Sequence, residues 1–444
     1  MLKYLSLAVL STLITLGTAT RSIPRCGATD PADYDSRDVY HRDVVIIGGG
    51  SSGVYSAMRL RDHGKTVMII EKQDKLGGHA EAWTDPPSGT PVNIGGVVFA
   101  TPPRTFVDCT TGTVVDFTEP DAAAFAVALD KYSSHLSEFP ALQDSFNMTY
   151  PVHPDLLLSF GEFVAKYGLG DLVPQVFRYN QGAAPLLDIS MVYLFKYLNS
   201  GEISSLKQGF LSVNCHSVTE LYRRAADGLA HDVLFDSTVV GMDRSLPEEV
   251  RVAVQTPAGL KLVIAKKLLS TIPPVLANLV GYDISAEERT LFSQFFANGY
   301  YTGVLNNTGL DPGAALVNHA PGRPHGIPDL PGIYAMHSTP LPGDRFLTNV
   351  FYGSPAVLPD DEVKADIVKA IHRYQMENGL PVTRPDWLTF SSHSPLISWW
   401  PMERSPTAST TDSSGCRGGV ILFIMGRRGI RMSLVRCGGL LITT

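Results

Sequence analysis

Three glycines behind an apolar stretch near the N-terminus form the most chemically informative pattern in this sequence. Residues 43–47 read Asp-Val-Val-Ile-Ile, which predicts a buried strand, and the glycines come directly after it. In such a strand–turn–helix unit Gly48 allows a tight turn and Gly50 lets the backbone approach a pyrophosphate. Gly53, on the following helix, lets the helix pack closely. Amides at the start of the helix then face the phosphates. The residues that we expect to contact a dinucleotide here are Gly48, Gly50, Ser51, Ser52 and Gly53.

An acidic residue closes the next apolar stretch, which reads Thr-Val-Met-Ile-Ile. This residue, Glu71, lies roughly 20 residues beyond the glycines, where an acid accepts hydrogen bonds from ribose hydroxyls. Lys72 beside it is a further candidate contact, and a glycine pair, Gly77 and Gly78, follows with His79 next to it. Glycine-rich loops also occur without ligands, but the order strand, glycine turn, helix, strand and acid predicts a nucleotide site.

The elements that must position these residues belong to a chain of 444 residues, long enough for two or three domains. Its composition, 44% apolar and 18% charged, is that of a globular protein, and its formal net charge is −7. No basic stripe is present, so we expect no nucleic-acid partner. The five cysteines show neither metal-ligand spacing nor a disulfide framework, so we expect no metal site.

The N-terminus has the pattern of a signal peptide over residues 1–19. Lys3 supplies the positive charge, residues 4–16 the apolar stretch, and Gly-Thr-Ala at 17–19 a small-residue cleavage site. A single membrane anchor is the alternative, but the stretch is shorter than the ~20 apolar residues that a span needs, so we expect no stable span. Secretion, or retention in the secretory pathway, agrees with two glycosylation sequons at Asn147 and Asn306.

Apolar periodicity predicts the other elements. We expect a linker over residues 20–41, mostly helices over 120–204, and a helix over 218–229 that Ser217 or Thr219 caps. Alternating apolar residues then predict strands. The expected strands cover residues 233–235, 237–243, 250–256, 261–265, 267–272, 334–336 and 345–352, and further helices cover 283–297 and 360–378.

With these residues in place, the chain resembles the flavin-containing amine oxidase superfamily, and within it the fungal flavoproteins similar to beta-cyclopiazonate dehydrogenase. The resemblance spans about residues 42–395. The segments that carry it are residues 48–53, 71, 77–78, 90–96, 233–243 and 268–274. It implies a bound FAD, with Gly77 and Gly78 near its phosphates and ribityl chain. The further FAD contacts that it implies are Gly95, Gly96 and the backbone of Val239 or Val240. His79 could approach the flavin, or be a loop histidine without a role.

The resemblance implies an α/β fold with two domains: a Rossmann-like FAD-binding domain and a discontinuous, mixed α+β substrate domain. We expect the FAD-binding domain over residues 42–110 and 205–275. The substrate domain would comprise a helical part over 111–204 and a second part over 276–398.

The expected function is that of an FAD-dependent oxidoreductase, an oxidase or dehydrogenase. It would move a hydride from a C–N or activated C–C bond of a small organic substrate, such as a fungal secondary metabolite, to the flavin. Because the flavin carries this chemistry, the sequence contains no catalytic triad or carboxylate pair that we can nominate. Oxygen is the expected electron acceptor. One alternative is an NAD(P)-linked reductase, although a second complete glycine fingerprint is absent; the other is an inactive remnant.

Aromatic residues on two later strands are candidates for the substrate cavity. They are Tyr300, Tyr301, Phe351 and Tyr352, and the competing interpretation is that they belong to the core.

The tail, residues 399–444, departs from the pattern of such proteins. Residues 413–444 contain five arginines and no acid, and the expected Tyr-Tyr-Gly-Ala-Ala-Trp segment that returns to the flavin is missing. Codon degeneracy permits that segment in a shifted reading frame, so we hypothesise a frame-shifted tail; a genuinely divergent tail is the alternative. In its present form the tail would deprive FAD of its last wall.

Overall fold

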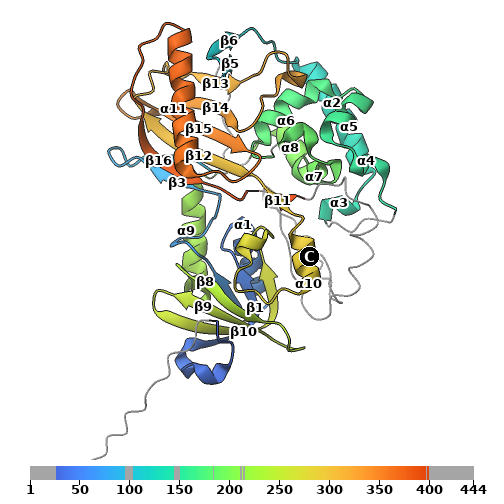
Figure 1. Ribbon diagram of the computed structural model, residues 1–444, viewed down its shortest axis with the longest axis vertical. Coiled ribbons are helices and arrows are strands. Elements are labelled where there is room, and N and C mark those ends of the chain that lie inside the picture. The colour runs from blue at the N-terminus through green and yellow to red at the C-terminus, as the bar shows by residue number, and fades with distance from the viewer. Residues whose placement is uncertain are drawn as a thin grey trace, which may run out of the picture.

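The computed structural model describes residues 27–95, 104–144, 151–183, 185–210, 213, 216–396 and 398–399. This part of the chain contains a six-stranded sheet at the bottom of Figure 1, a seven-stranded sheet at the top, and a group of helices beside the second sheet. The tail beyond residue 399 and the proposed signal peptide lie outside the described residues.

The six-stranded sheet is built on buried apolar strands. In spatial order it comprises β7 (Val233–Leu234), β2 (Val67–Ile70), β1 (Val39–Ile47), β10 (Gly259–Ser270), β9 (Val250–Thr256) and β8 (Thr238–Asp243). The first four strands are parallel to one another, and β9 runs antiparallel to both of its neighbours, β10 and β8. All four residues of β2 are buried, as expected for a parallel strand covered on both faces. Helices α1 (Ser51–Asp62) and α9 (Val218–Leu229) pack on one face.

The seven-stranded sheet is formed almost entirely by the second half of the chain. In spatial order it comprises β16 (Asp386–Ser392), β12 (Gly299–Asn306), β15 (Arg345–Ser354), β14 (Gly332–Leu341), β13 (Ala315–Asn318), β5 (Arg104–Asp108) and β6 (Thr113–Val115). Its neighbouring strands are antiparallel except for β13 and β5. Helix α11 (Asp360–Glu377) covers one face, and the group of helices packs against residues of the other.

The helical group has an aromatic core. It contains α2 (Ala122–Ser137), α3 (Ala141–Asp144), α4 (Pro154–Leu157), α5 (Phe160–Tyr167), α6 (Val173–Tyr179), α7 (Met191–Tyr197) and α8 (Ser200–Gln208). Asp121 caps α2, and Ser159 and Glu162 form a capping box at α5, so local sequence determines where these helices begin. Tyr132, Phe163 and Phe195 are fully buried among them.

Smaller elements connect the large ones. These are α10 (Ala286–Phe292), the hairpin of β3 (Ala82–Thr84) with β4 (Pro91–Asn93), and the pair of β11 (Phe296–Ala297) with β17 (Ser398–Trp399). The short 3₁₀ helices are η1 (Pro31–Asp33), η2 (Ser36–Asp38), η3 (Gly170–Leu172), η4 (Leu186–Asp188), η5 (Ala230–Asp232), η6 (Leu276–Asn278) and η7 (Pro324–Gly326).

The structure moves three of the expected boundaries. Residues 104–110 were assigned to the FAD-binding domain, but β5 pairs with β13 in the seven-stranded sheet. Residues 276–292 were assigned to the substrate domain, but Tyr282 packs in the core of the six-stranded sheet. The expected linker over 20–41 already contains η1, η2 and the start of β1. The first shift arises because strand pairing between distant segments decides which domain a segment joins, and local periodicity does not report such pairing.

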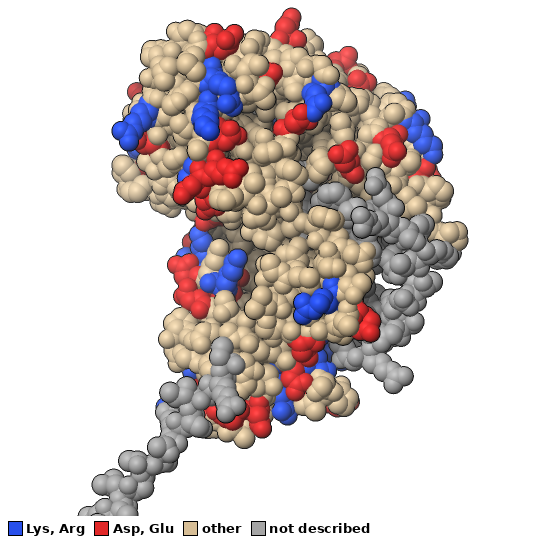
Figure 2. Space-filling view, viewed as in Figure 1, with Lys and Arg blue, Asp and Glu red and all other residues tan. Residues whose placement is uncertain are grey.

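The surface carries mixed charges. On the face in Figure 2, basic and acidic side chains alternate over both ends of the molecule and do not gather into a continuous basic patch. Among the described residues, no helix combines the length and apolar character that crossing a bilayer would require.

Candidate functional site

One large cavity lies between the two sheets, and its volume is about 1570 Å³. Its walls come from the glycine turn after β1, the N-terminus of α1, the end of β10, one face of α9 and the segment that follows β16. The predicted residues on these walls are Gly48, Gly50, Ser51, Ser52, Glu71, Lys72, Gly78, His79, Gly95, Val239, Val240 and Tyr300.

The glycine turn brings α1 directly against the end of β1. Gly48 has a φ of 100°, and its amide donates to Ile70 O at 2.9 Å, which closes the turn. Gly53 lies on the first turn of α1, where a Cβ would stand 1.9 Å from Gly48 O. This glycine is therefore outside the cavity but sets the position of the helix. The helix has Gly50 as its N-cap, a residue without a side chain to accept hydrogen bonds from the first helical amides. Its amides are thus available to an anion.

Glu71 is held rigidly at the end of β2. Its Oε2 accepts the Gly49 amide at 2.6 Å, and its Oε1 accepts the Gln73 amide at 2.8 Å. The residue is 7% exposed and lies on the cavity wall. Each carboxylate oxygen has two lone pairs, so each can accept one further hydrogen bond. This arrangement suits a pair of ribose hydroxyls.

The second glycine pair packs against the first turn. Gly77 and Gly78 have φ values of 118° and 56°, and a Cβ on Gly78 would approach the Cα of Gly50 to 2.9 Å. Gly77 faces the ring of Tyr222, whose hydroxyl lies 2.6 Å from Ser51 Oγ. The pair therefore lets two turns and α9 converge beside the start of α1, as only residues without side chains allow.

At the end of the cavity that contains the glycine turns, the wall opposite these turns is formed by β8 and the segment after β10. Val240 is the extra residue of a β-bulge between Val239 and Gly241, so its backbone leaves the regular ladder with β9. Gly281 packs on it, because a Cβ there would stand 3.0 Å from Val239 O. Tyr282 follows, and burial raises its pKa to about 12, so this phenol on the cavity wall stays neutral.

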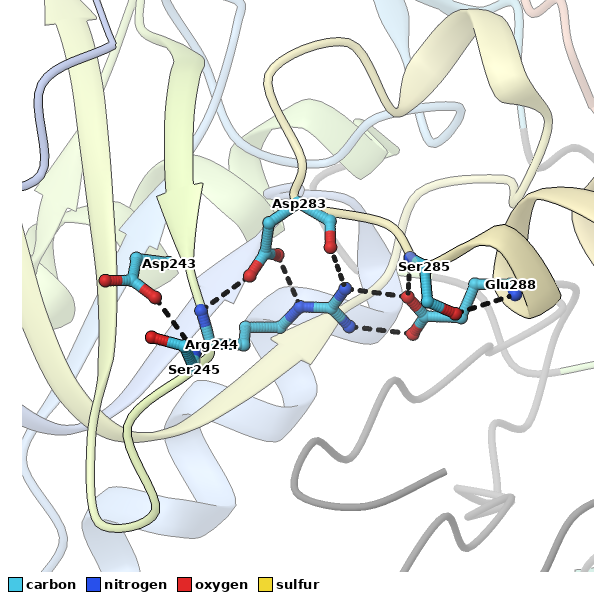
Figure 3. Close-up of polar contacts among 6 residues, drawn as sticks. All are labelled: Asp243, Arg244, Ser245, Asp283, Ser285 and Glu288. Atoms are coloured by element: carbon cyan, nitrogen blue, oxygen red, sulfur yellow. Dashed lines mark hydrogen bonds and ion pairs between the residues drawn. The ribbon is translucent and has the colours of Figure 1, made fainter. Parts of the chain in front are cut away.

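An ion-pair cluster fixes that segment (Figure 3). Arg244, at the end of β8, donates Nε to Asp283 at 2.6 Å, and both of its Nη atoms donate to Glu288 at 2.8 Å. Its own amide donates to Asp283 at 2.6 Å. Burial alone would raise the pKa of Glu288, but hydrogen bonds from Arg244 and the Ser285 backbone lower it, so the cluster stays charged. Arg244 thereby ties residues 281–288 to β8.

Two histidines and a tyrosine line the other end of the cavity. The rings of His79 and His393 lie 5.1 Å apart in a T-shaped arrangement. His393 is 2% exposed, and its Nε2 lies 3.0 Å from Thr302 Oγ1. Tyr300 donates its hydroxyl to Gln181 Oε1 at 3.0 Å. Gly95 is packed tightly here, since a Cβ would stand 2.0 Å from His79 O.

Three of the four aromatic residues predicted for the substrate cavity do not line it. Tyr301 and Tyr352 point to the opposite face of the sheet and pack with α11, where their hydroxyls bond to Leu358 and Asp366. Phe351 packs in the core between the sheet and the helices. The prediction failed because side chains alternate along a strand, and the sequence does not say which set faces the cavity.

The remaining predictions concern the two glycosylation sequons, Gly96 and metal binding. Asn306 is exposed at the end of β12, whereas the Thr308 hydroxyl of its sequon is buried against Thr348 at 2.7 Å. Gly96 and Asn147 lie outside the described residues. Among the described residues, no group of three or more side chains could hold a metal ion.

Three further parts of the cavity wall were not predicted from the sequence. These are Tyr222 on α9, His393 after β16 and the prolines after β10, Pro273 and Pro274. The proline pair lies within residues 268–274, which carry the family resemblance, but neither proline was expected to line a site. Only its position at the C-terminal edge of a parallel sheet, where ligands bind, could have indicated a role.

The residues present fit FAD. Gly48 and Gly78 are packed so closely that a Cβ on either would stand within 3.0 Å of a neighbouring atom, and they lie beside an uncapped helix terminus suited to a pyrophosphate. Glu71 would hold the ribose, and the backbone at Val240 would face the adenine. The remaining cavity, toward Gly95, leaves room for a ring system.

Comparison with solved structures shows the fold. The chain matches a fatty acid isomerase from P. acnes that produces CLA, with a TM-score of 0.61, 17% identity and coverage of 83% of this chain and 87% of that one. It also matches putrescine oxidase bound to putrescine, with a TM-score of 0.52, 16% identity and coverage of 82% and 87%. The chain therefore has the fold of these two enzymes.

Sequence comparison gives the family. Residues 46–117 match the family described as "NAD(P)-binding Rossmann-like domain". FAD-dependent oxidoreductase oblC of Cochliobolus heterostrophus is 34% identical over 395 residues, which cover 82% of each chain. Beta-cyclopiazonate dehydrogenase of Aspergillus oryzae is 32% identical over 389 residues, with coverage of 82% and 83%. The chain belongs to this family of fungal FAD-dependent oxidoreductases, and FAD is its cofactor.

Proposed function

We propose that this enzyme oxidises a small organic molecule by removing a hydride from a C–N or activated C–C bond. The single observation that carries the proposal is the continuous cavity from the glycine turn to the His79–His393 end. It joins a dinucleotide site to the part of the cavity lined by His79, His393 and Tyr300, which we call the chamber. The dehydrogenase name of the relative from Aspergillus oryzae supports oxidation of a fungal secondary metabolite. An NAD(P)-linked reduction is less well supported, because the cavity contains a single glycine cradle among the described residues.

The protein's part in this reaction is to bind, orient and exclude water. When bound, FAD supplies the hydride acceptor. The seven-stranded sheet closes the chamber on one side, and the helical group buries Gln181 and Tyr300 on another. Walls on two sides reduce the water around a bound substrate, and this strengthens its electrostatic interactions.

Polar groups at the chamber end are fixed by their own hydrogen bonds. A hydrogen bond joins Nε2 of His393 to Oγ1 of Thr302, and the Tyr300 hydroxyl donates to Gln181 Oε1. These side chains are therefore preorganised and need not reorient when substrate arrives, which is the property that catalysis requires of positioning groups.

The proposal also covers the electron acceptor and the location of the protein. Oxygen would reoxidise the flavin, as the likeness to oxidases supports. The protein would act in the secretory pathway or outside the cell, as the signal-like residues 1–19 and the exposed Asn306 support.

Anaerobic reduction tests the proposed reaction. The purified flavoprotein is mixed with a panel of amines and of carbonyl compounds with activated C–C bonds, and the visible flavin absorption is followed. We expect bleaching by members of one class, then recovery and peroxide release when air is admitted. Bleaching by NADPH alone would contradict the proposal and favour the nicotinamide-linked alternative.

A further inference from the structure

Tyr222 lies on the cavity wall beside the start of α1, although it comes from the distant helix α9. Its hydroxyl oxygen is 2.6 Å from Oγ of Ser51, which is the first residue of α1. Both residues belong to the cavity lining. The contact therefore joins α9 to the helix terminus that is suited to the diphosphate of FAD.

Packing fixes the ring of Tyr222 independently of this hydrogen bond. A Cβ on Gly77 would stand 3.0 Å from Cδ2 of the ring and 3.1 Å from Cγ, so the ring packs directly on the glycine pair. The same ring packs against the apolar core between the sheet and its helices. Thr219, three residues earlier on α9, accepts the Ala82 amide at 2.8 Å through its hydroxyl. The ring should therefore stay in place when only its hydroxyl oxygen is removed.

The two hydroxyl groups contain one proton more than their mutual hydrogen bond uses. Each hydroxyl has one O–H, and one of the two donates to the other. Among the described residues, neither hydroxyl oxygen has another hydrogen-bond partner. A phenol is a stronger acid than an aliphatic alcohol, so Tyr222 is the better donor of the two. Ser51 then keeps its own proton for a third group at the start of α1.

Neutral donors have an important part at this site, because positive side chains are scarce. The described cavity lining contains one lysine, Lys72, and no arginine, and it also contains two glutamates, Glu71 and Glu81. Among the described lining residues, a diphosphate therefore depends chiefly on helix amides and hydroxyl groups. The remaining proton of the Tyr222–Ser51 pair is one such donor.

We propose that Tyr222 is a positioning residue for FAD: it donates to Ser51 Oγ and directs the Ser51 proton to the diphosphate. This donation also polarises the Ser51 hydroxyl, because hydrogen bonds in a chain strengthen one another. The inference concerns how the cofactor is held and does not depend on which bond the enzyme oxidises. FAD should bind more weakly when the Tyr222 hydroxyl is absent.

A double-mutant cycle tests this role. Full-length Tyr222→Phe, Ser51→Ala and the double variant are freed of FAD and titrated with FAD in a calorimeter. We expect Tyr222→Phe to weaken binding about tenfold, as the loss of a hydrogen bond to a charged group does, and Ser51→Ala at least as much. Because Tyr222 acts through Ser51, the double variant should bind within threefold of Ser51→Ala. A double variant that binds more weakly than this, or a loss below threefold in Tyr222→Phe, would overturn the proposal.

A second tyrosine provides the matched control. Tyr40→Phe removes the same atom from β1 of the same sheet, outside the described cavity lining, and should bind FAD as the unmodified protein does. The FAD-free forms of Tyr222→Phe and Tyr40→Phe should also unfold at the same temperature. If FAD-free Tyr222→Phe unfolds well below the control, the hydroxyl supports the fold and does not position the cofactor, which would refute the assignment.

Discussion

Replacing Gly53 by alanine tests how the glycine turn positions the helix. The added Cβ would lie 1.9 Å from Gly48 O, whereas real contacts of this kind essentially never fall below 3.0 Å. The start of α1 must therefore move by about 1 Å from the turn. Overpacking of this kind costs about 1–3 kcal/mol, partly offset by the about 0.5–1 kcal/mol that alanine gains over glycine in a helix.

The larger effect is expected on FAD binding. Hydrogen bonds to a charged phosphate contribute about 1.5–3 kcal/mol each, so misplacing one helix amide weakens binding by roughly 10- to 100-fold. Isothermal titration of the apoprotein with FAD measures this dissociation constant, and urea unfolding measures the stability.

A second glycine provides the control. Gly228 lies in α9, and a Cβ there would meet nothing within 4 Å. Gly228→Ala should therefore stabilise the protein by about 0.5–1 kcal/mol and leave FAD binding unchanged. If Gly53→Ala binds FAD within threefold of the unmodified protein, the close approach of helix and turn does not position the cofactor.

Three further substitutions probe other parts of the account. Glu71→Gln places an amide donor against the Gly49 or Gln73 amide, so FAD should bind at least tenfold more weakly by titration. Arg244→Met leaves Glu288 unpaired and should lower the unfolding free energy by about 3 kcal/mol, against less than about 1 kcal/mol for Arg251→Met, whose side chain is 25% exposed; equal losses would contradict this. His337 has a lowered pKa of about 4, so the unfolded chain binds its proton first and stability falls between about pH 6.5 and 4. When urea unfolding is measured at pH 7 and at pH 4.5, the unfolding free energy of His337→Phe should fall by up to about 3 kcal/mol less than that of the unmodified protein.

Local sequence was enough to predict that the residues around the glycine turn lie close together. A strand, a glycine turn, a helix and an acid are consecutive, so the positions of Gly48 and Glu71 on one wall follow from short-range geometry. The helix over 218–229 with its Ser217 cap was confirmed for the same reason. Residues 259–270 form one continuous strand, where two were expected, because β1 and β9 flank it.

The substrate end could not be predicted in this way. Whether Tyr300 or Tyr301 faces the chamber depends on the pairing of β12 with β15, which joins residues about 50 positions apart. His393 reaches the chamber because the chain after β16 continues alongside β12, where the Tyr300 carbonyl accepts the His393 amide at 2.9 Å.

The visible absorption spectrum of the purified protein tests the central claim most directly. The cavity between the glycine turn and the His79–His393 end is predicted to retain FAD, so the protein should show the flavin band, and heating should release FAD in proportion to the protein present. A folded protein that has no flavin band, and whose unfolding temperature does not rise when FAD is added, would contradict the account.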